Sequence, residues 1–207
     1  MAARAEAGVS MSTQALAALA RRLNREAGGP PVPALYFFTD PERTPDPIAI
    51  ARMLPTETAV VYRHFGGLER AKVARQLATI CRSRRLALLI AADPELADRV
   101  GAAGVHWPER KLPTARDARF QLVTASAHSR KAVARAESWG ADACFLGPVF
   151  ETRSESGNAP LGLFRASQIA RGSTIPVIAL GGVALRNAQR LSGRGFAGFA
   201  AVDAFLD

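Results

Sequence analysis

The stretch Gly140–Ser156, GADACFLGPVFETRSES, decides the fold. Its apolar run Ala143–Leu146 stops at Gly147-Pro148, and because proline has no N–H for a neighbouring strand, a central strand ends there. The hydroxyl and charged side chains that follow are Thr152, Arg153, Ser154 and Glu155. In parallel α/β folds, ligands bind at the carboxyl ends of the strands. The stretch therefore predicts a buried parallel strand whose end carries a binding loop.

A second strand end of the same kind lies downstream. Pro176–Ala179 is apolar, and Leu180–Gly182 follows it before a helical segment. Glycine lets a ligand approach the backbone closely, and free N–H groups before a helix favour phosphate. We therefore expect Gly181 and Gly182 to form an anion-binding rim together with Thr152.

The rest of the chain repeats the pattern of a buried strand followed by a helix. Apolar runs occupy residues 34–38, 59–62, 86–91, 104–107, 120–125, 143–146, 176–180 and 196–202. Segments with helical spacing begin near Asp46, Leu68, Pro94, His128, Leu161 and Ala184. Such alternation indicates an α/β fold with a covered parallel sheet, either open and doubly wound or closed. Eight runs favour a closed (βα)8 barrel of the TIM type, and the short stretch after the last run predicts a reduced last helix.

The residues before the first strand predict an added helix. Ser12 or Thr13 is expected to cap it, and it should run to about Ala27. Its apolar face consists of Leu16, Leu19, Ala20 and Leu23. We expect this face to dock on the flank of the last strand, which the reduced last helix leaves uncovered. The predicted organisation is a helical extension, residues 1–31, and a barrel domain, residues 32–207.

Composition limits the classes of function. The 207 residues carry a net charge of +9, which invites a nucleic-acid interpretation. Most of that charge is arginine on predicted helix faces, with three lysines in all and no interleaved aromatic platform. A solvated, arginine-rich surface is therefore the preferred interpretation, and no nucleic-acid partner is expected.

The expected location is the cytoplasm. No apolar run approaches the roughly 20 residues of a membrane span, so no membrane partner is expected. The first residues lack the apolar core of a secretory signal. Cys81 and Cys144 lie in apolar contexts typical of buried, reduced thiols.

Read in order, the strand ends resemble those of the thiamine-phosphate synthase and thiazole tautomerase family. The matching segments are ALYFFTD (34–40), VVYRHF (60–65), LIAAD (89–93), GVHWPERK (104–111), TASAH (124–128), GADACFLGPVFETRSE (140–155), IPVIALGG (175–182) and GFAAVDAF (198–205). The match spans about residues 34–206 in one register, and the sixth and seventh segments are the most specific. The resemblance implies a (βα)8 barrel and a transferase of thiamine biosynthesis that joins a pyrimidine diphosphate to a thiazole phosphate.

The resemblance also implies roles for individual residues. Arg63 and Asp93, the latter through Mg²⁺, would hold the diphosphate, and Ser126 completes the predicted catalytic set. The predicted substrate-binding residues are His106, Thr152, Arg153, Ser154, Gly181 and Gly182. Departure of the diphosphate builds negative charge, which needs cations held in place beforehand. The expected partners are small phosphorylated thiazole and pyrimidine ligands, and a homo-oligomer is compatible with the sequence.

This chain departs from the family at several of these positions. Family residues that hold the diphosphate or the metal are replaced by Val61, Phe65, Ala92 and Lys111. One remaining carboxylate is a poor magnesium site, so either Glu109 joins Asp93 as a metal ligand, or cations supply the charge without a metal. The cations available for the second arrangement are Lys111, Arg110 and Arg153.

Two further departures affect the phosphate end. The family's lysine in the loop after the sixth strand is Glu155 here, and a serine on the eighth strand is Asp203. A carboxylate beside a phosphate repels it unless an arginine intervenes.

Other interpretations stay open. A thiazole tautomerase needs a proton shuttle, but its histidine position is Pro148 here, with Glu151 as the nearest substitute. A barrel that binds a thiazole or thiamine phosphate without catalysis is a third possibility. Asp93 has a purely structural interpretation as the cap of the helix that starts at Pro94, and His106 has one as a packing residue at a strand end.

Overall fold

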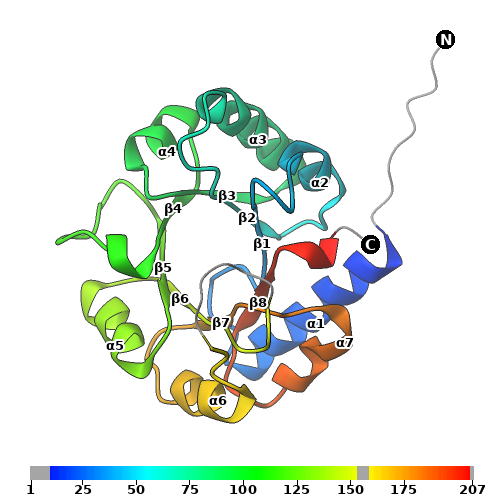
Figure 1. Ribbon diagram of the computed structural model, residues 1–207, viewed down its shortest axis with the longest axis vertical. Coiled ribbons are helices and arrows are strands. Elements are labelled where there is room, and N and C mark those ends of the chain that lie inside the picture. Colours follow the sequence, from blue (N-terminus) through cyan, green and yellow to red (C-terminus); the bar gives the residue numbers. More distant parts are fainter. Residues whose placement is uncertain (1–9, 153–158, 206–207) are drawn as a thin grey trace.

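Eight parallel strands form a closed barrel in which each strand pairs with the next in the chain and β8 closes against β1 (Figure 1). The computed structural model describes residues 10–152 and 159–205. The strands are β1 Leu35–Phe38, β2 Ala59–Tyr62, β3 Ala87–Ala91, β4 Gly104–Trp107, β5 Leu122–Ala127, β6 Ala143–Leu146, β7 Val177–Ala179 and β8 Gly198–Ala201. All eight predicted runs are strands of this barrel, so the predicted (βα)8 class is confirmed.

Helices surround the strands on the outside (Figure 1). They are α1 Met11–Glu26, α2 Pro47–Met53, α3 Arg70–Arg84, α4 Pro94–Val100, α5 Arg130–Trp139, α6 Leu163–Arg171 and α7 Leu185–Ala188. Three short 3₁₀ helices are η1 Glu109–Lys111, η2 Gln189–Leu191 and η3 Asp203–Phe205. Within the described residues, β8 is followed by η3 alone, in line with the expected reduction of the last helix. No helix in the described part of the chain has the length and apolar character needed to cross a bilayer.

Large and small side chains alternate inside the barrel. Tyr36 and Phe38 of β1 meet Phe145 of β6 edge to face, with ring centroids 4.7 and 4.8 Å apart. Small residues of the same cluster, such as Ala59 of β2 and Ala143 of β6, leave room for these rings. Because side chains fill the barrel, a ligand is restricted to its ends.

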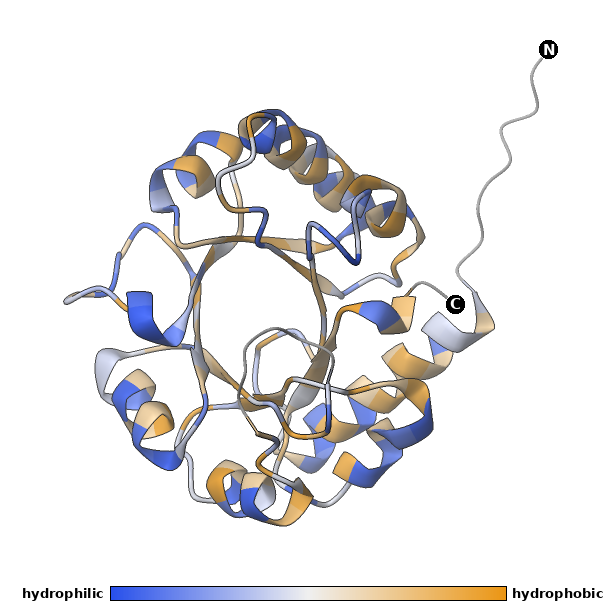
Figure 2. Cartoon of the chain, in the orientation of Figure 1, coloured by the Kyte–Doolittle hydropathy of each residue, from blue (hydrophilic) through white to orange (hydrophobic). Residues whose placement is uncertain are grey.

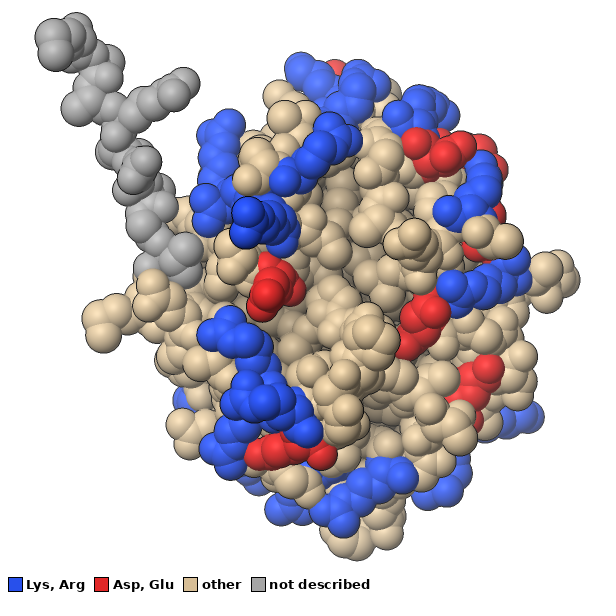
Figure 3. Space-filling view, turned by 180° about the vertical axis from the view of Figure 1, so that it is seen from behind, with Lys and Arg blue, Asp and Glu red and all other residues tan. Residues whose placement is uncertain are grey.

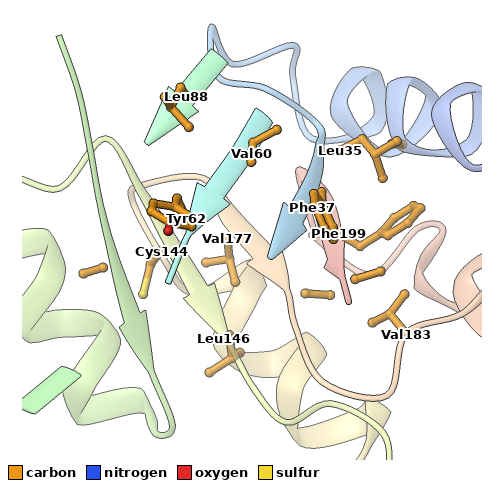
Figure 4. Close-up of a cluster of buried hydrophobic side chains, with 14 of the residues drawn as sticks. Leu35, Phe37, Val60, Tyr62, Leu88, Cys144, Leu146, Val177, Val183 and Phe199 are labelled. Atoms are coloured by element: carbon orange, nitrogen blue, oxygen red, sulfur yellow. The ribbon is translucent and has the colours of Figure 1, made fainter. Parts of the chain in front are cut away.

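A second hydrophobic layer lies between the strands and the helices. Figure 4 shows part of it, with Phe37, Val60 and Phe199 pointing away from the barrel interior. Figure 2 shows hydrophobic residues on the strands and on the inner faces of the helices, and hydrophilic residues on the outer faces. This two-layer burial explains why the strands read as continuous apolar runs.

Helix α1 packs beside β8, β1 and α7 (Figure 1). Leu16, Ala20 and Leu23 are fully buried there, which confirms the predicted docking face. The predicted cap at Ser12 or Thr13 is wrong, because the earlier hydroxyl of Ser10 accepts the N–H of Thr13. The division of the chain at residue 31 stays a prediction, and within the described residues α1 belongs to the same hydrophobic cluster as the strands.

Candidate functional site

A cavity of about 800 Å³ opens at the carboxyl ends of the strands. Most of the predicted site residues line it: Arg63, His106, Glu109, Ser126, Thr152, Gly181 and Gly182. Asp93 is not part of its described lining. Arg153 and Ser154 lie outside the described residues. Residues on or directly after β2, β4, β5, β6 and β7 thus meet at one cavity.

The ends of β6 and β7 are joined beyond the strands themselves. Val149 N–H donates to Leu180 O at 2.9 Å, and Phe150 N–H donates to Gly181 O at 3.1 Å. A side chain at Gly181 would overlap Pro148, and one at Gly182 would overlap the Glu151 carbonyl. Glycine is therefore required at these two positions by close packing. This reason adds to the expected close approach of a ligand to the backbone.

The backbone after β7 is shaped to receive an acceptor. Gly181 and Gly182 have φ of +89° and +67°, conformations that favour glycine. Among the described residues, no group accepts a hydrogen bond from the N–H of either glycine. Asn187 fixes the segment, since its amide donates to Gly182 O at 2.8 Å and accepts from Ala184 N–H at 2.9 Å. The predicted glycine pair thus presents two free donors at the cavity.

His106 is at the centre of a buried hydrogen-bonded chain. Its Nδ1 lies 3.0 Å from Thr124 Oγ1, and its Nε2 lies 3.0 Å from Ser126 Oγ. The rings of Phe38 and Phe145 contact it edge to face, each 5.2 Å away. Burial, and then the charge of Arg63, lowers the pKa of His106 to about 3. A neutral imidazole therefore orients the Ser126 hydroxyl, which reaches the cavity.

Arg63 is held in one position at the end of β2. Its Nε donates to Thr39 O at 2.8 Å, and its guanidinium lies 5.2 Å from the centre of the Phe38 ring. Burial lowers the pKa of Arg63, although the carboxylate of Asp40, 3.4 Å away, opposes the shift. An arginine fixed in this way has little side-chain entropy left to lose when an anion binds.

Arg43 links two carboxylates near Arg63. It contacts Asp40 at 2.9 Å and Asp203 at 3.4 Å. Burial alone would raise the pKa of Asp40, but hydrogen bonds from the Arg43 side chain and backbone outweigh it, and the net pKa falls below the usual value. The arginine required to offset Asp203 is therefore present. It lies in the loop after β1, where sequence patterning gave no signal for it.

Phe65, where the family resemblance places a lysine, lies close to two cations. Arg70 is 5.6 Å and Lys111 5.1 Å from the centre of its ring. Arg70 also pairs with Asp93 at 2.7 Å and donates to Ala91 O at 2.8 Å. Phe65 is about half exposed and lines the cavity, so this wall combines an aromatic surface with positive charge.

The two carboxylates predicted to bind Mg²⁺ already have protein partners. Asp93 caps α4 by accepting the N–H of Leu96 at 2.9 Å, and it pairs with Arg70. Glu109 accepts from the ring of His128 at 2.6 Å and from its backbone N–H at 2.9 Å. Within residues 10–152 and 159–205, no three His, Cys, Asp or Glu side chains come together as a metal site would require. This donor set does not fit a magnesium ion, and the assignment of Asp93 and Glu109 as ligands stays a prediction.

Sequence reasoning missed three residues of this site. Thr124 could have been found, since it lies two positions before Ser126 and therefore on the same face of β5. Arg43 and Arg186, which both line the cavity, follow strand ends without any local pattern. Arg186 has no ion-pair partner among the described residues.

The fold and the site define a (βα)8 barrel whose candidate ligand cavity lies at the carboxyl ends of its strands, the position used by barrel enzymes. A family model described as Thiamine monophosphate synthase matches residues 35–205. The chain therefore belongs to this family, and the resemblance at its strand ends is confirmed.

Individual relatives agree with this assignment. A thiamine-phosphate synthase of Chlorobium luteolum is 30% identical, with 84% of this chain and 86% of the relative covered. Another, of Marinobacter nauticus, is 33% identical over 77% of this chain and 76% of the relative. Among solved structures, a thiamine phosphate pyrophosphorylase from Pyrococcus furiosus superposes with a TM-score of 0.68 at 23% identity, covering 91% of this chain and 93% of that one. The last likeness supports the fold, and the first two support a transferase of thiamine biosynthesis.

Proposed function

We propose that the chain joins a pyrimidine diphosphate to a thiazole phosphate in the cavity at the carboxyl ends of the strands. The observation that carries the proposal is the convergence of Arg63, Ser126 and the Gly181–Gly182 donors on one cavity. A cavity of about 800 Å³ falls within the usual size range of small-molecule sites.

The β6–β7 side is the proposed site of the thiazole phosphate. The free N–H groups of Gly181 and Gly182 are donors for its oxygens, and Thr152 lines the same edge. Arg186 adds a full positive charge, which compensates for the family lysine replaced by Glu155. The predicted contacts of Arg153 and Ser154 with this group belong to the same proposal.

The diphosphate is proposed to lie toward β2 and β4. Its departure breaks the bond to the pyrimidine carbon and leaves negative charge on oxygen, so a fixed cation lowers the barrier. Arg63 is such a cation. In the tautomer of neutral His106 whose Nε2–H donates to Ser126 Oγ, the Ser126 hydroxyl proton is free to donate to the same leaving group. Lys111 and Arg70, both close to the Phe65 ring, supply further positive potential.

A second candidate function is the binding of thiazole or thiamine phosphate without turnover. The occupied carboxylates favour it, because metal-assisted departure of the diphosphate would first have to break the ion pair of Asp93 with Arg70 and the hydrogen bonds of Glu109 with His128. The tautomerase alternative has no comparable support, since Pro148 replaces its histidine and Glu151 is the nearest substitute acid.

The two cysteines bear on the location of the protein. Cys81 and Cys144 are both buried and free, which supports a cytoplasmic location. A homo-oligomer stays a prediction.

The test is a direct assay of the purified chain with both phosphorylated substrates, with and without Mg²⁺. Formation of thiamine phosphate together with pyrophosphate supports the transferase. We expect turnover about a hundredfold or more below that of the Chlorobium luteolum relative assayed in parallel, because preorganised charge contacts are replaced. Tight binding of thiamine phosphate without any turnover would instead support the binding protein.

A further inference from the structure

A second cavity, of about 500 Å³, lies at the opposite end of the barrel. It is formed by α1, by the start of β1 and by the segments that lead into β2 and β3. Figure 3 views the molecule from the side opposite to Figure 1, and Lys and Arg side chains gather there along the flank formed by α1. No part of the proposed synthase site borders on this cavity.

Its floor is apolar and built from small or buried side chains. Ala17 and Ala20 contribute from α1, Leu35 and Ala87 from the first residues of β1 and β3. The alanines follow at i and i+3 and so face the cavity together. A cavity of this size and lining suits a small ligand with an apolar body, such as one aromatic ring.

The rim carries unpaired positive charge. Arg21 and Arg25 come from α1 and Arg85 from the end of α3, while Glu57 is the one acidic residue in the lining. Three arginines and one glutamate give the described lining a net charge of +2. None of the three arginines has an ion-pair or hydrogen-bond partner for its side chain among the described residues.

Some neighbouring arginines are paired and others are not. Arg22 pairs with Glu26 at 2.8 Å, and Arg84 donates to Leu54 O at 3.0 Å. Arg75 and Arg82 of α3 lie outside the cavity without an ion pair or side-chain hydrogen bond among the described residues. What distinguishes the three rim arginines is therefore their position around one apolar cavity.

Backbone strain occurs at the same rim. Glu57 and Arg85 have φ of +67° and +57°, in the left-handed region that residues other than glycine rarely adopt. The N–H of Glu57 donates to Arg85 O at 3.1 Å, which locks the two strained positions together. At Arg85 this conformation is that of the C-cap of α3, and the turn that it makes places Arg85 beside Glu57 at the rim.

We infer that this cavity binds a small organic anion: an apolar ring rests on the alanine floor, and a phosphate or carboxylate group contacts Arg21, Arg25 and Arg85. Guanidinium groups bind both kinds of anion through paired hydrogen bonds. Glu57 favours a ligand that also carries a hydrogen-bond donor, and it disfavours polyanions. The site is independent of the proposed transferase reaction.

Phenyl phosphate, benzoate and the uncharged benzyl alcohol are the probes for the test. Each is titrated into the ¹⁵N-labelled full chain, and the amide shifts of Asn24, Val32 and Thr58 are compared with those of Gly181 and Gly182. We expect phenyl phosphate or benzoate, and not benzyl alcohol, to move the first set. The anion that does so identifies the charged group. Shifts confined to the glycines, no shifts, or equal binding of benzyl alcohol would each overturn the inference.

Charge variants locate the contact. Arg85→Gln should weaken binding at this site about tenfold, because one charge-assisted hydrogen-bonded contact is lost. Combining it with Arg21→Gln and Arg25→Gln should abolish binding. The matched control is Arg82→Gln, which removes the same charge from an exposed position of α3 outside the cavity. An equal loss in the control would mean that net charge alone attracts the anion and would refute a built site.

Discussion

Two walls of the carboxyl-end cavity differ in how they hold their polar groups. The β6–β7 wall, made by Gly147, Pro148, Thr152, Gly181 and Gly182, offers backbone N–H groups fixed by close packing. The wall at β2–β4, made by Arg63, Phe65 and Glu109, offers side chains, and its two charged ones already have partners in the protein: Asp40 for Arg63 and His128 for Glu109. The residues named for the first wall fit the family pattern that the strand ends resemble, whereas Phe65 of the second wall stands where that pattern has a lysine.

The difference follows from what each wall can tolerate. At Gly182, any side chain collides with the Glu151 carbonyl, so a change of residue disrupts the packing of β6 against β7. At Phe65, the side chain is half exposed and its replacement disturbs little else. Packing therefore restricts which residues can form the β6–β7 wall. At the β2–β4 wall, a side chain can be replaced and the remaining charged groups can form other ion pairs. The thiazole-phosphate side should therefore keep its affinity better than the diphosphate side.

The largest effect is expected from Gly182→Ala. Both the positive φ and the overlap with Glu151 must be relieved, so binding of thiazole phosphate should fall at least a hundredfold and the unfolding midpoint by several degrees. Gly193→Ala is the matched control, since Gly193 has a similar φ of +65° but open space around it. Calorimetry and thermal unfolding of both variants test this. Equal behaviour of the two would show that close packing does not define the wall.

A smaller loss is expected from Arg63→Gln. The variant removes the fixed cation while a side chain remains above Phe38, and affinity for inorganic pyrophosphate should fall about tenfold or more. Arg52→Gln, at an exposed position of α2, removes the same charge outside the cavity. If calorimetry gave the two variants the same affinity, Arg63 would be a structural partner of Asp40 and Thr39 only.

The barrel could be predicted because each of its strands is marked by a short stretch of consecutive residues. The strands lie in short, mainly apolar runs, and β1, β2, β4, β5 and β6 are followed directly by glycine, proline or a polar residue. Helix α4 starts at an Asp-Pro pair that caps it in the structure. The β6–β7 wall was predictable for the same reason, since strand ends place Thr152, Gly181 and Gly182 at one edge. The β2–β4 wall was not, because Arg43 and Arg70 meet Asp203 and Asp93 across the fold.

His106 gives an effect of intermediate size that depends on pH. Its pKa of about 3 in the folded state lies below the ordinary value of 6.5, so the unfolded chain binds a proton more readily. Stability should therefore be complete above about pH 6.5 and decrease as the pH falls toward 3. At pH 5 the loss from this residue is about 2 kcal/mol relative to pH 7. Urea unfolding across this range, with His106 ring signals followed by NMR, tests the point, and titration of His106 near pH 6.5 in the folded protein would contradict it.

The smallest effect on stability is expected from Asp93→Asn. This variant also tests most directly whether the β2–β4 wall binds a metal ion. Asparagine still caps α4, so the variant loses only the half-buried ion pair with Arg70, worth roughly 1 kcal/mol or less. Asp46→Asn is the matched control, because Asp46 caps α2 through Ile48 and Ala49 N–H groups without an ion pair among the described residues. Pyrophosphate affinity is then measured by calorimetry over a range of Mg²⁺ concentrations. If Asp93 acts as the partner of Arg70, the Mg²⁺ dependence stays the same in both variants. If Asp93→Asn alone required about tenfold more Mg²⁺, Asp93 would be a metal ligand that leaves Arg70 when the diphosphate arrives, and the two walls would be less different than their ion pairs indicate.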